Sequence, residues 1–332
     1  MNKNVQVLLA SRPEGWVEES NFEIVERDLP KPVPGEVLVH NHWLSLDPYM
    51  RGRMGTGKSY SAPVEIGAVM VGGTVGEIIE SSHPRLKAGQ FVVGSLGWQL
   101  YAVSNGEGLA VVDPKLVPLQ AYLGAVGMPG VTAHIGLLEH CQPKAGETVV
   151  VSAASGAVGG VVGQLAKMQG CRTVGIAGGA AKCEYVVKEL GFDACVDYKA
   201  GNLYEDLKAA CPDGIDCYFE NVGGVVMDTV LRHLNAFSRV ALCGLIADYN
   251  LTDPYGIKMI RAILVNRVNV RGFIVSDRMD LYQRAIPRLA KLVAGGKIKY
   301  RETIAEGLRA APKSFIGLLK GENFGKQLVK LT

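Results

Sequence analysis

Small residues at a fixed spacing, directly after a β-branched run, could bind a phosphate group. The run TVVVS at residues 148–152 suits a buried parallel strand. Ala154, Gly156 and Gly159 follow it at the spacing G-x-G-x-x-G, with alanine at the first position. Without a Cβ at Gly156 a diphosphate can approach the backbone, and free N–H groups at the start of the next helix can receive its oxygens. The pattern indicates a dinucleotide site, although an ordinary glycine-rich turn has the same spacing.

The residues after the second strand distinguish between the two nicotinamide dinucleotides. An acidic residue about 20 positions beyond the glycine turn binds the adenosine ribose 2′-hydroxyl in NAD enzymes. Gly178 and Gly179 stand there instead, so no carboxylate repels a 2′-phosphate. Lys182 supplies a cation at a helix start that already favours anions, and NADPH is therefore the expected cofactor. Lys182 could equally be a solvated helix lysine, and Tyr198, after the third strand, a packing tyrosine.

Strands and helices must alternate around this turn to position it. After residues 148–152, further strand-like runs lie at residues 173–177, 194–197, 216–221, 239–243 and 268–273. Crossover helices are expected at residues 180–190, 203–210, 225–234 and 257–266. Because right-handed crossovers bring the carboxyl ends of parallel strands to one rim, the pattern predicts an α/β Rossmann domain with a doubly wound parallel six-stranded sheet.

The flanking parts of the chain have a different texture. Short alternating runs such as residues 36–42 and 90–93, separated by proline and glycine, are typical of a compact β domain. After Gly296 a strand, a helix and a last strand are expected, at residues 298–303, 312–319 and 327–331.

We expect this tail to rejoin the N-terminal domain. The substrate domain would then comprise residues 1–122 and 297–332, and the dinucleotide domain residues 123–296. The active cleft should lie where the two domains meet.

The composition is that of a globular protein in a reducing compartment. With 332 residues, 48% of them hydrophobic and 20% charged, the chain is expected to form two domains. Its 35 basic and 32 acidic residues are interspersed, which predicts no nucleic-acid and no membrane partner. Seven cysteines without a C-x-x-C pair fit free thiols, and the N-terminal apolar run is too short for a secretory signal. We therefore expect a cytoplasmic protein.

The residues that commonly bind metal ions are not arranged as a zinc site requires. Many dehydrogenases with this order of domains bind zinc through Cys, His and Glu, but residues 67–73, GAVMVGG, contain none of these. His40 and His42 would face the same way on a strand, without a third ligand nearby. His134 and His140, six residues apart, are even weaker candidates for metal ligands. No metal is expected.

Four separated motifs resemble those of a known family. They are LSLDPYMRGRM at residues 44–54, GMPG at 127–130, ENVGG at 220–224 and GLLKGENFGK at 317–326. The chain resembles the zinc-free medium-chain dehydrogenase/reductases, in the leukotriene B4 dehydrogenase or prostaglandin reductase branch, which includes plant 2-alkenal reductases and bacterial curcumin reductases. The bacterial curcumin reductases look most similar. The resemblance implies a GroES-like substrate domain, a Rossmann domain, NADPH, and reduction of a carbon–carbon double bond conjugated to a carbonyl.

The resemblance also implies which residues contact the cofactor. Around the diphosphate these are Met128, Gly156, Ala157, Val158 and Gly159, with Lys182 and Tyr198 at the 2′-phosphate. Along the rest of the cofactor they are Asn221, Cys243, Gly244, Leu245, Ile246, Tyr249, Phe273, Ile274, Val275 and Asn323. Structural alternatives remain: Cys243 and Phe273 could be core residues, and Asp47-Pro48 could only start a helix. Asn221 at a strand end is awkward unless a partner is bound, which favours function.

The implied reaction needs a hydrogen-bond donor beside the substrate. Hydride transfer to the β-carbon of an enone or enal leaves negative charge on the carbonyl oxygen. Tyr249, in a loop at the carboxyl rim of the sheet, is the expected donor, and Tyr49 is the second candidate. The α-carbon proton could come from water. Tyr249 could also be an ordinary loop tyrosine.

Two other functions fit the same residues. One is an NADPH:quinone oxidoreductase, and the other is a non-catalytic NADPH-binding protein built on the same fold. The resemblance also implies a homodimer joined through the last Rossmann strand, near residues 268–273, whose edge would otherwise be unpaired.

Overall fold

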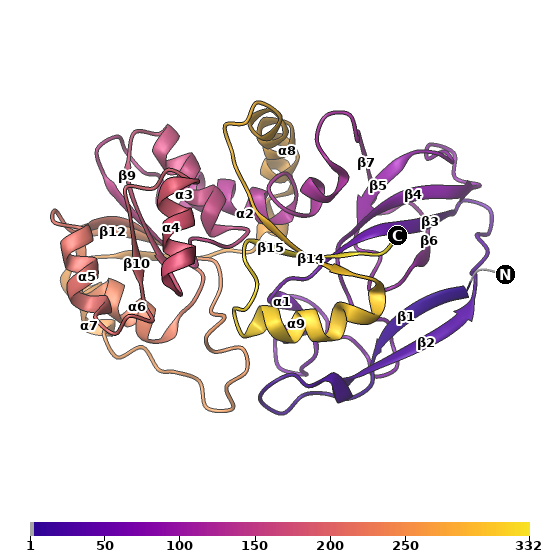
Figure 1. Ribbon diagram of the computed structural model, residues 1–332, viewed down its shortest axis with the longest axis horizontal. Coiled ribbons are helices and arrows are strands. Elements are labelled where there is room, and N and C mark those ends of the chain that lie inside the picture. The colour runs from indigo at the N-terminus through magenta and orange to yellow at the C-terminus, as the bar shows by residue number, and fades with distance from the viewer. Residues whose placement is uncertain (1–2) are drawn as a thin grey trace. The chain divides into compact units, whose positions relative to one another are not determined.

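The chain folds into two units of different architecture (Figure 1). The structure is a computed structural model that describes residues 3–332. The first unit comprises residues up to Gly124, Glu302–Asn323 and Gln327–Thr332. The second unit comprises Ala125–Arg301 and Phe324–Lys326.

The second unit thus includes residues 297–301 and 324–326, which were expected in the substrate domain. The backbone N–H and C=O of Lys299 each form a 2.8 Å hydrogen bond with the side-chain amide of Gln164. Further along, Gly325 forms a parallel backbone bridge with Gly156. These bonds hold both segments against the elements around the glycine turn.

The second unit alternates strands and helices. Its strands are β8 (Thr148–Ser152), β9 (Arg172–Ala177), β10 (Ala194–Asp197), β11 (Ile215–Glu220), β12 (Leu234–Leu242) and β13 (Asn269–Gly272). Its α-helices are α2 (Met128–Ile135), α3 (Gly159–Met168), α4 (Ala180–Lys188), α5 (Leu203–Ala210), α6 (Gly224–Leu231), α7 (Ile260–Val265) and α8 (Met279–Ala294). A π-helical turn, η3 (Gly136–Cys141), extends α2, and a short 3₁₀ turn, η4 (Val275–Arg278), precedes α8.

The six strands form one parallel sheet in the order β10-β9-β8-β11-β12-β13. This confirms the predicted doubly wound fold. In β8, Val149 and Val151 point to the core formed with α2, α3 and α8, whereas Val150 points to the core formed with α5, α6 and α7. Burial on both faces explains the unbroken β-branched run.

Two element boundaries differ from those expected, and two helices were not expected. The helix expected over residues 225–234 ends at Leu231, because Leu234 already begins the long strand β12. The strand expected at residues 298–303 begins only at Glu302, because Ile298 is buried in the core of the second unit. The helices α2 and α8 were not predicted; they pack against each other over one face of the sheet.

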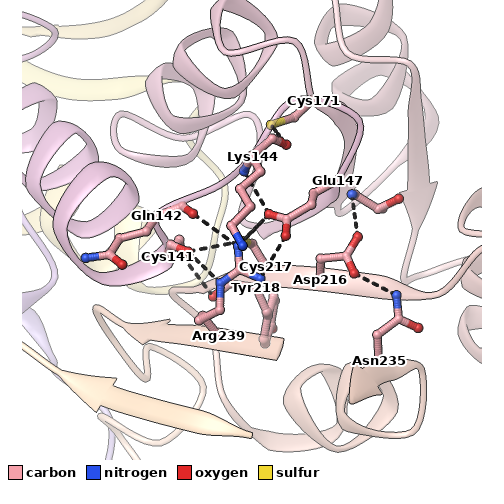
Figure 2. Close-up of polar contacts among 11 residues, drawn as sticks. Cys141, Gln142, Lys144, Glu147, Cys171, Asp216, Cys217, Tyr218, Asn235 and Arg239 are labelled. Atoms are coloured by element: carbon pink, nitrogen blue, oxygen red, sulfur yellow. Dashed lines mark hydrogen bonds and ion pairs between the residues drawn. The ribbon is translucent and has the colours of Figure 1, made fainter. Parts of the chain in front are cut away.

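A polar network joins β11 and β12 to the segment that leads into β8 (Figure 2). The Arg239 guanidinium in β12 makes two hydrogen bonds to the Glu147 carboxylate, at 3.1 and 2.5 Å, and donates to the carbonyl oxygen of Cys141 at 2.9 Å. Next to it, the Asp216 carboxylate in β11 accepts from the Thr148 N–H at 2.9 Å. Burial raises the pKa of Glu147, but the bonds and charge of Arg239 and Lys144 bring it below its ordinary value.

The first unit is built mostly from strands. These are β1 (Lys3–Leu9), β2 (Phe22–Asp28), β3 (Val37–Ser45), β4 (Thr74–Ser81), β5 (Phe91–Gly94), β6 (Tyr101–Ser104), β7 (Ala110–Val112), β14 (Glu302–Glu306) and β15 (Lys326–Lys330). Its helical segments are η1 (Glu19–Asn21), α1 (Tyr49–Arg53), η2 (Leu119–Leu123), η5 (Leu308–Ala310) and α9 (Ala311–Leu319).

A seven-stranded sheet and a β1–β2 hairpin share an aromatic core in this unit. The sheet order is β14-β15-β3-β4-β5-β7, with β6 paired to β3. Trp98, fully buried, stacks on Phe22 at 5.5 Å between ring centroids and meets the edge of Phe315 in α9 at 5.6 Å. The GroES-like fold predicted for this part of the chain is confirmed. None of the helices within residues 3–332 is long and apolar enough to span a bilayer.

Candidate active site

The glycine turn between β8 and α3 leaves room for a ligand oxygen at its N–H groups. A Cβ on Gly159 would lie 2.4 Å from the carbonyl oxygen of Ala153, so only glycine permits this approach of helix to strand. No side chain caps α3. Within residues 3–332, the N–H groups of Val158 and Gly159 donate to no other backbone or side-chain group. Such a helix start fits a diphosphate, as the sequence predicted.

The carboxyl-terminal segment forms one wall beside this turn. Gly325, at φ +75°, bridges to Gly156, and a Cβ on Gly325 would lie 1.9 Å from the carbonyl oxygen of Arg301. The Arg301 guanidinium lies 4.0 Å from the ring centroid of Phe324, whose ring meets the edge of Tyr185 in α4 at 5.0 Å. A recess between these groups is lined by Ser155, Gly156, Ala157, Tyr185, Arg301 and Lys326. The basic residues Arg301 and Lys326 line this recess and were not among the residues predicted from the sequence.

Lys182 and Tyr198, predicted at the adenosine end, are joined there by a second lysine. A Cβ on Gly178 would lie 2.8 Å from the ring of Tyr198 and 3.0 Å from the side chain of Lys199, so both side chains cover this glycine. Burial, together with the charge of Lys199, lowers the pKa of Lys182. Two cations and a phenol therefore gather at the start of α4, an arrangement that suits a phosphate. Lys199 was missed, although it directly follows Tyr198.

In the structure a carboxylate lies at the end of the second strand, although the sequence places none there. A carboxylate does lie beside Gly179, because the Asp197 Oδ1 at the end of β10 accepts its N–H at 2.8 Å and the N–H of Lys199 at 2.9 Å. This carboxylate comes from the third strand rather than from the second. The two N–H groups and the neighbouring lysines compensate its charge.

The loop after β12 is fastened to the end of β11. Its backbone N–H groups at Ile246 and Ala247 donate to the carbonyl oxygens of Asn221 and Val222, at 3.3 and 2.9 Å. The Asn221 side chain donates to the carbonyl oxygen of Ser152 at 2.8 Å, so the expectation that it needs a bound partner was wrong. Asn221 instead links the carboxyl ends of β8 and β11.

Tyr249 lies over this loop. Its hydroxyl oxygen accepts the N–H of Leu245 at 3.3 Å, and a Cβ on Gly244 would lie 3.3 Å from the same oxygen. The loop thus brings together four of the predicted residues, Cys243 to Ile246, and the predicted hydrogen-bond donor at the carboxyl rim of the sheet.

Comparison with known proteins places the chain in a family. Residues 5–112 match the family described as the N-terminal domain of oxidoreductase, and residues 157–291 match the family described as zinc-binding dehydrogenase. The chain is 47% identical to the NADPH-dependent curcumin reductase of Escherichia coli, over 99% of this chain and 97% of that protein. It is 41% identical to the NADP(+)-dependent 2-alkenal reductase of Nicotiana tabacum, over 99% and 98% of the two chains. The chain belongs to the medium-chain dehydrogenase/reductases.

Two further relatives place it in one branch of the medium-chain dehydrogenase/reductases. Prostaglandin reductase 1 of Rattus norvegicus is 43% identical, over 96% of both chains. The crystal structure of CurA from Vibrio vulnificus in complex with NADPH has a TM-score of 0.94 and 46% identity, and the match covers 99% of both chains. The branch predicted from the four motifs, that of the curcumin, alkenal and prostaglandin reductases, is confirmed.

One matched family is described as zinc-binding, and the candidate ligands for zinc are therefore of interest. Within residues 3–332 no three His, Cys, Asp or Glu side chains are grouped so that they could hold a metal ion. His40 stacks on Tyr101 at 4.5 Å and meets His42 at 5.2 Å, while His42 meets the edge of Phe91 at 5.8 Å. Burial lowers the pKa of both histidines, which form part of an aromatic cluster.

The remaining predicted residues of the second unit lie at element ends. Met128 begins α2, and Phe273 to Val275 follow β13. Phe273 packs on His140 at 4.8 Å and on Phe219 at 6.2 Å, so part of its role is in the core. Burial raises the pKa of Cys243 to about 12, so its thiol stays protonated at neutral pH.

Two predicted residues lie in the first unit. Asn323 ends the segment that precedes Phe324. Tyr49 begins α1, and burial, with the nearby Asp47 and Tyr60, raises the pKa of its hydroxyl well above the ordinary value. A tyrosine in this state keeps its proton and can act as a hydrogen-bond donor.

Proposed function

We propose that this protein is an NADPH-dependent reductase of the carbon–carbon double bond in α,β-unsaturated ketones and aldehydes. The observation that carries the proposal is the pair of anion sites on one unit, the uncapped turn at Gly156–Gly159 and the cluster of Lys182, Tyr198 and Lys199. Relatives named as curcumin, 2-alkenal and prostaglandin reductases, at 41–47% identity over nearly the whole chain, support the reaction. Bound NADPH supplies a hydride.

The chain's own groups hold the two phosphate-bearing parts of the cofactor. The N–H groups of Val158 and Gly159 bind the diphosphate at the positive end of the α3 dipole, with Ala157 beside them. Lys182 and Lys199 bind the 2′-phosphate, and Tyr198 packs beside it. These contacts favour NADPH over NADH, because NADH has no group to pair with the two lysines.

Tyr249 is proposed as the donor to the carbonyl oxygen of the substrate. Its hydroxyl oxygen accepts the N–H of Leu245, which helps to fix the position of the phenol. Donation to an oxygen that becomes negative as the double bond is reduced stabilises the transition state more than the ground state. Tyr49, held in its protonated form by burial, is the second candidate donor. The α-carbon then takes its proton from water.

Oxidation of the cofactor in the presence of defined acceptors tests this function. We expect the purified protein to oxidise NADPH with an enone such as curcumin and with a 2-alkenal, and to use NADH at least about 10-fold less efficiently. A 1,4-benzoquinone serves as the competing acceptor. Activity with the quinone alone would assign the protein as a quinone oxidoreductase, and no oxidation with any acceptor would assign a binding role.

We further propose a homodimer formed along the edge of the Rossmann sheet. Among residues 3–332, β13 pairs with β12 only, so its other edge has free backbone groups. The neighbouring helix α7 exposes Ile260, Leu264 and Val265, and Leu264 is 78% exposed. An apolar surface next to an open strand edge supports self-association. Sedimentation at the dimer mass is expected, and a monomer at micromolar concentration would refute it.

We propose a cytoplasmic location because the cysteines are not paired in disulfides. All seven are free thiols in the structure. Proteins that keep so many unpaired thiols are typical of a reducing compartment. Fractionation of the native host should recover the activity with the cytoplasmic markers; recovery with secreted proteins would contradict the proposal.

A further inference from the structure

Glu220, the last residue of β11, is a carboxylate enclosed by donors. The residue is fully buried. Its Oε2 accepts the Tyr218 hydroxyl at 2.5 Å, and its Oε1 accepts the Ser152 hydroxyl at 2.7 Å and the N–H of Val222 at 2.5 Å. Burial raises the pKa of this carboxyl, which the surrounding donors counteract. A buried carboxyl group costs stability unless its hydrogen bonds are formed, and here they are formed by residues of β8, of β11 and of the turn after β11.

These bonds hold the backbone of the turn that follows β11. Val222 is bound directly by Glu220. Asn221 is linked to Glu220 through Ser152. Its N–H donates at 2.8 Å to the Ser152 hydroxyl, which itself donates to Glu220. Both peptide groups of the turn are therefore held by one carboxylate and one hydroxyl.

The Asn221–Val222 turn is hydrogen-bonded to the loop that bears Tyr249. The carbonyl oxygens of Asn221 and Val222 accept the N–H groups of Ile246 and Ala247, as described above. The carbonyl oxygen of Glu220 also accepts the N–H groups of Cys243 and Gly244, at 2.9 and 3.1 Å.

The last link of this path is the N–H of Leu245, which donates to the Tyr249 hydroxyl. Gly223, at φ +79°, packs on Leu245, and a Cβ there would lie 3.0 Å from its side chain. A continuous series of hydrogen bonds and one close contact thus leads from the buried carboxylate to the phenol.

We propose that Glu220 is a positioning residue, which acts through the Asn221–Val222 turn to fix the loop 243–249 and the hydroxyl of Tyr249. The proposal rests on the proposed function, because it gives Tyr249 a substrate oxygen to meet. It also makes a statement about the protein without cofactor or substrate. Loss of the carboxylate must loosen this loop even when nothing is bound.

The main variant is Glu220→Met, which keeps a similar volume and removes every acceptor. Ser152→Ala is the second variant, because it removes only the hydroxyl between Glu220 and Asn221. The matched control is Glu147→Met, the same chemical change at the pair with Arg239, just before the start of β8 (Figure 2). The control lowers stability without touching the loop.

Hydrogen exchange of the cofactor-free protein is the first measurement. In Glu220→Met and Ser152→Ala the amides of Ile246 and Ala247 should exchange at least about 10-fold faster than in wild type, whereas Glu147→Met leaves them unchanged relative to the rest of the sheet. Unchanged loop exchange in either folded variant overturns the proposal. If Glu220→Met does not fold, Ser152→Ala alone decides.

A double-mutant cycle with Tyr249→Phe is the second measurement. Ser152→Ala should lower kcat about 10-fold with little change in the KM of the enone, and should lower it less than about 2-fold in the Tyr249→Phe background. Additive losses would show that Ser152 and Glu220 do not act through Tyr249. Failure of the proposed function is recognised separately, because wild type would then reduce no enone while the exchange result stands.

Discussion

Gly156, in the turn after β8, and Gly325, near the carboxyl terminus, form a parallel backbone bridge. The bridge joins a residue of the proposed phosphate-binding turn to a segment that follows it by about half of the chain. Gly325 can occupy its place only because it has no side chain, since a Cβ would lie 1.9 Å from the carbonyl oxygen of Arg301.

Replacing Gly325 by alanine should therefore disturb both stability and cofactor binding. We expect Gly325→Ala to lower the free energy of unfolding by about 2–4 kcal/mol. The NADPH Kd should rise at least about 10-fold, because the segment beside the glycine turn must shift. Gly321→Ala is the matched control: Gly321 has a similar φ of +71°, with no atom within 4 Å of the added Cβ. It should cost only about 1 kcal/mol. Equal effects of the two variants would contradict the contact argument.

Substitution of the proposed oxyanion donor should affect turnover rather than cofactor binding. Tyr249→Phe is expected to lower kcat by about 10- to 1,000-fold, with the NADPH Kd changed less than about 2-fold. Tyr49→Phe is the comparison, since Tyr49 is the second candidate donor. Steady-state kinetics with one enone and fluorescence titration with NADPH are sufficient. Wild-type turnover in Tyr249→Phe would remove this residue from the mechanism.

The two lysines at the adenosine end should determine the choice between NADPH and NADH. Lys182→Ala and Lys199→Ala are each expected to raise the KM of NADPH by about 10- to 100-fold and to leave that of NADH nearly unchanged. Lys188→Ala, further along α4, removes an exposed lysine paired with Glu184 and should change neither value. A parallel rise of both KM values would indicate a structural effect instead of phosphate recognition.

The ion pair between Glu147 and Arg239 should contribute stability that depends on pH. Because the pKa of Glu147 is lowered in the folded state, its contribution is complete above the ordinary pKa of 4.5 and is lost as the pH falls through the lowered value. We expect Glu147→Gln to be less stable than wild type by about 2 kcal/mol at pH 7, and the difference to shrink below about pH 4.5. Denaturant unfolding from pH 3 to 8 measures it. A constant difference over this range would refute the assignment.

Treatment with a chelator should leave the reductase activity unchanged. Among residues 3–332 there is no group of three ligand side chains for zinc. Incubation with EDTA, followed by addition of zinc, should give the same rate at each stage within error. Loss of activity in EDTA and its recovery with zinc would show that the reaction depends on a metal.

Local patterns predicted most of the Rossmann unit. The unbroken β-branched run of β8, the glycine spacing after it and the alternation of strands and helices are properties of short segments, and the structure contains them nearly where they were expected. Helix α8 was missed, although it is the longest helix of the second unit, and Pro287 interrupts its sequence. The strand expected to begin at residue 298 begins at Glu302 instead, because Ile298 packs in the core of the second unit.

The candidate site was predictable only where residues are neighbours in sequence. Lys182 and the glycine turn could be recognised from spacing alone. Lys199 and Asp197 reach the same place from another strand, so their role depends on the order of β9 and β10 in the sheet. Glu220 belonged to a recognised motif, but its function as an acceptor for Ser152 and Tyr218 depends on strand register.

The bridge between Gly156 and Gly325 also orders events during synthesis. A ribosome releases the strand and turn around Gly156 long before residue 325 leaves the exit tunnel, so the nascent Rossmann unit must wait with one side of its turn uncovered. Contacts so distant along the polypeptide form late and slow the final step of folding. The proposed cofactor site therefore lacks this wall until residue 325 has left the ribosome.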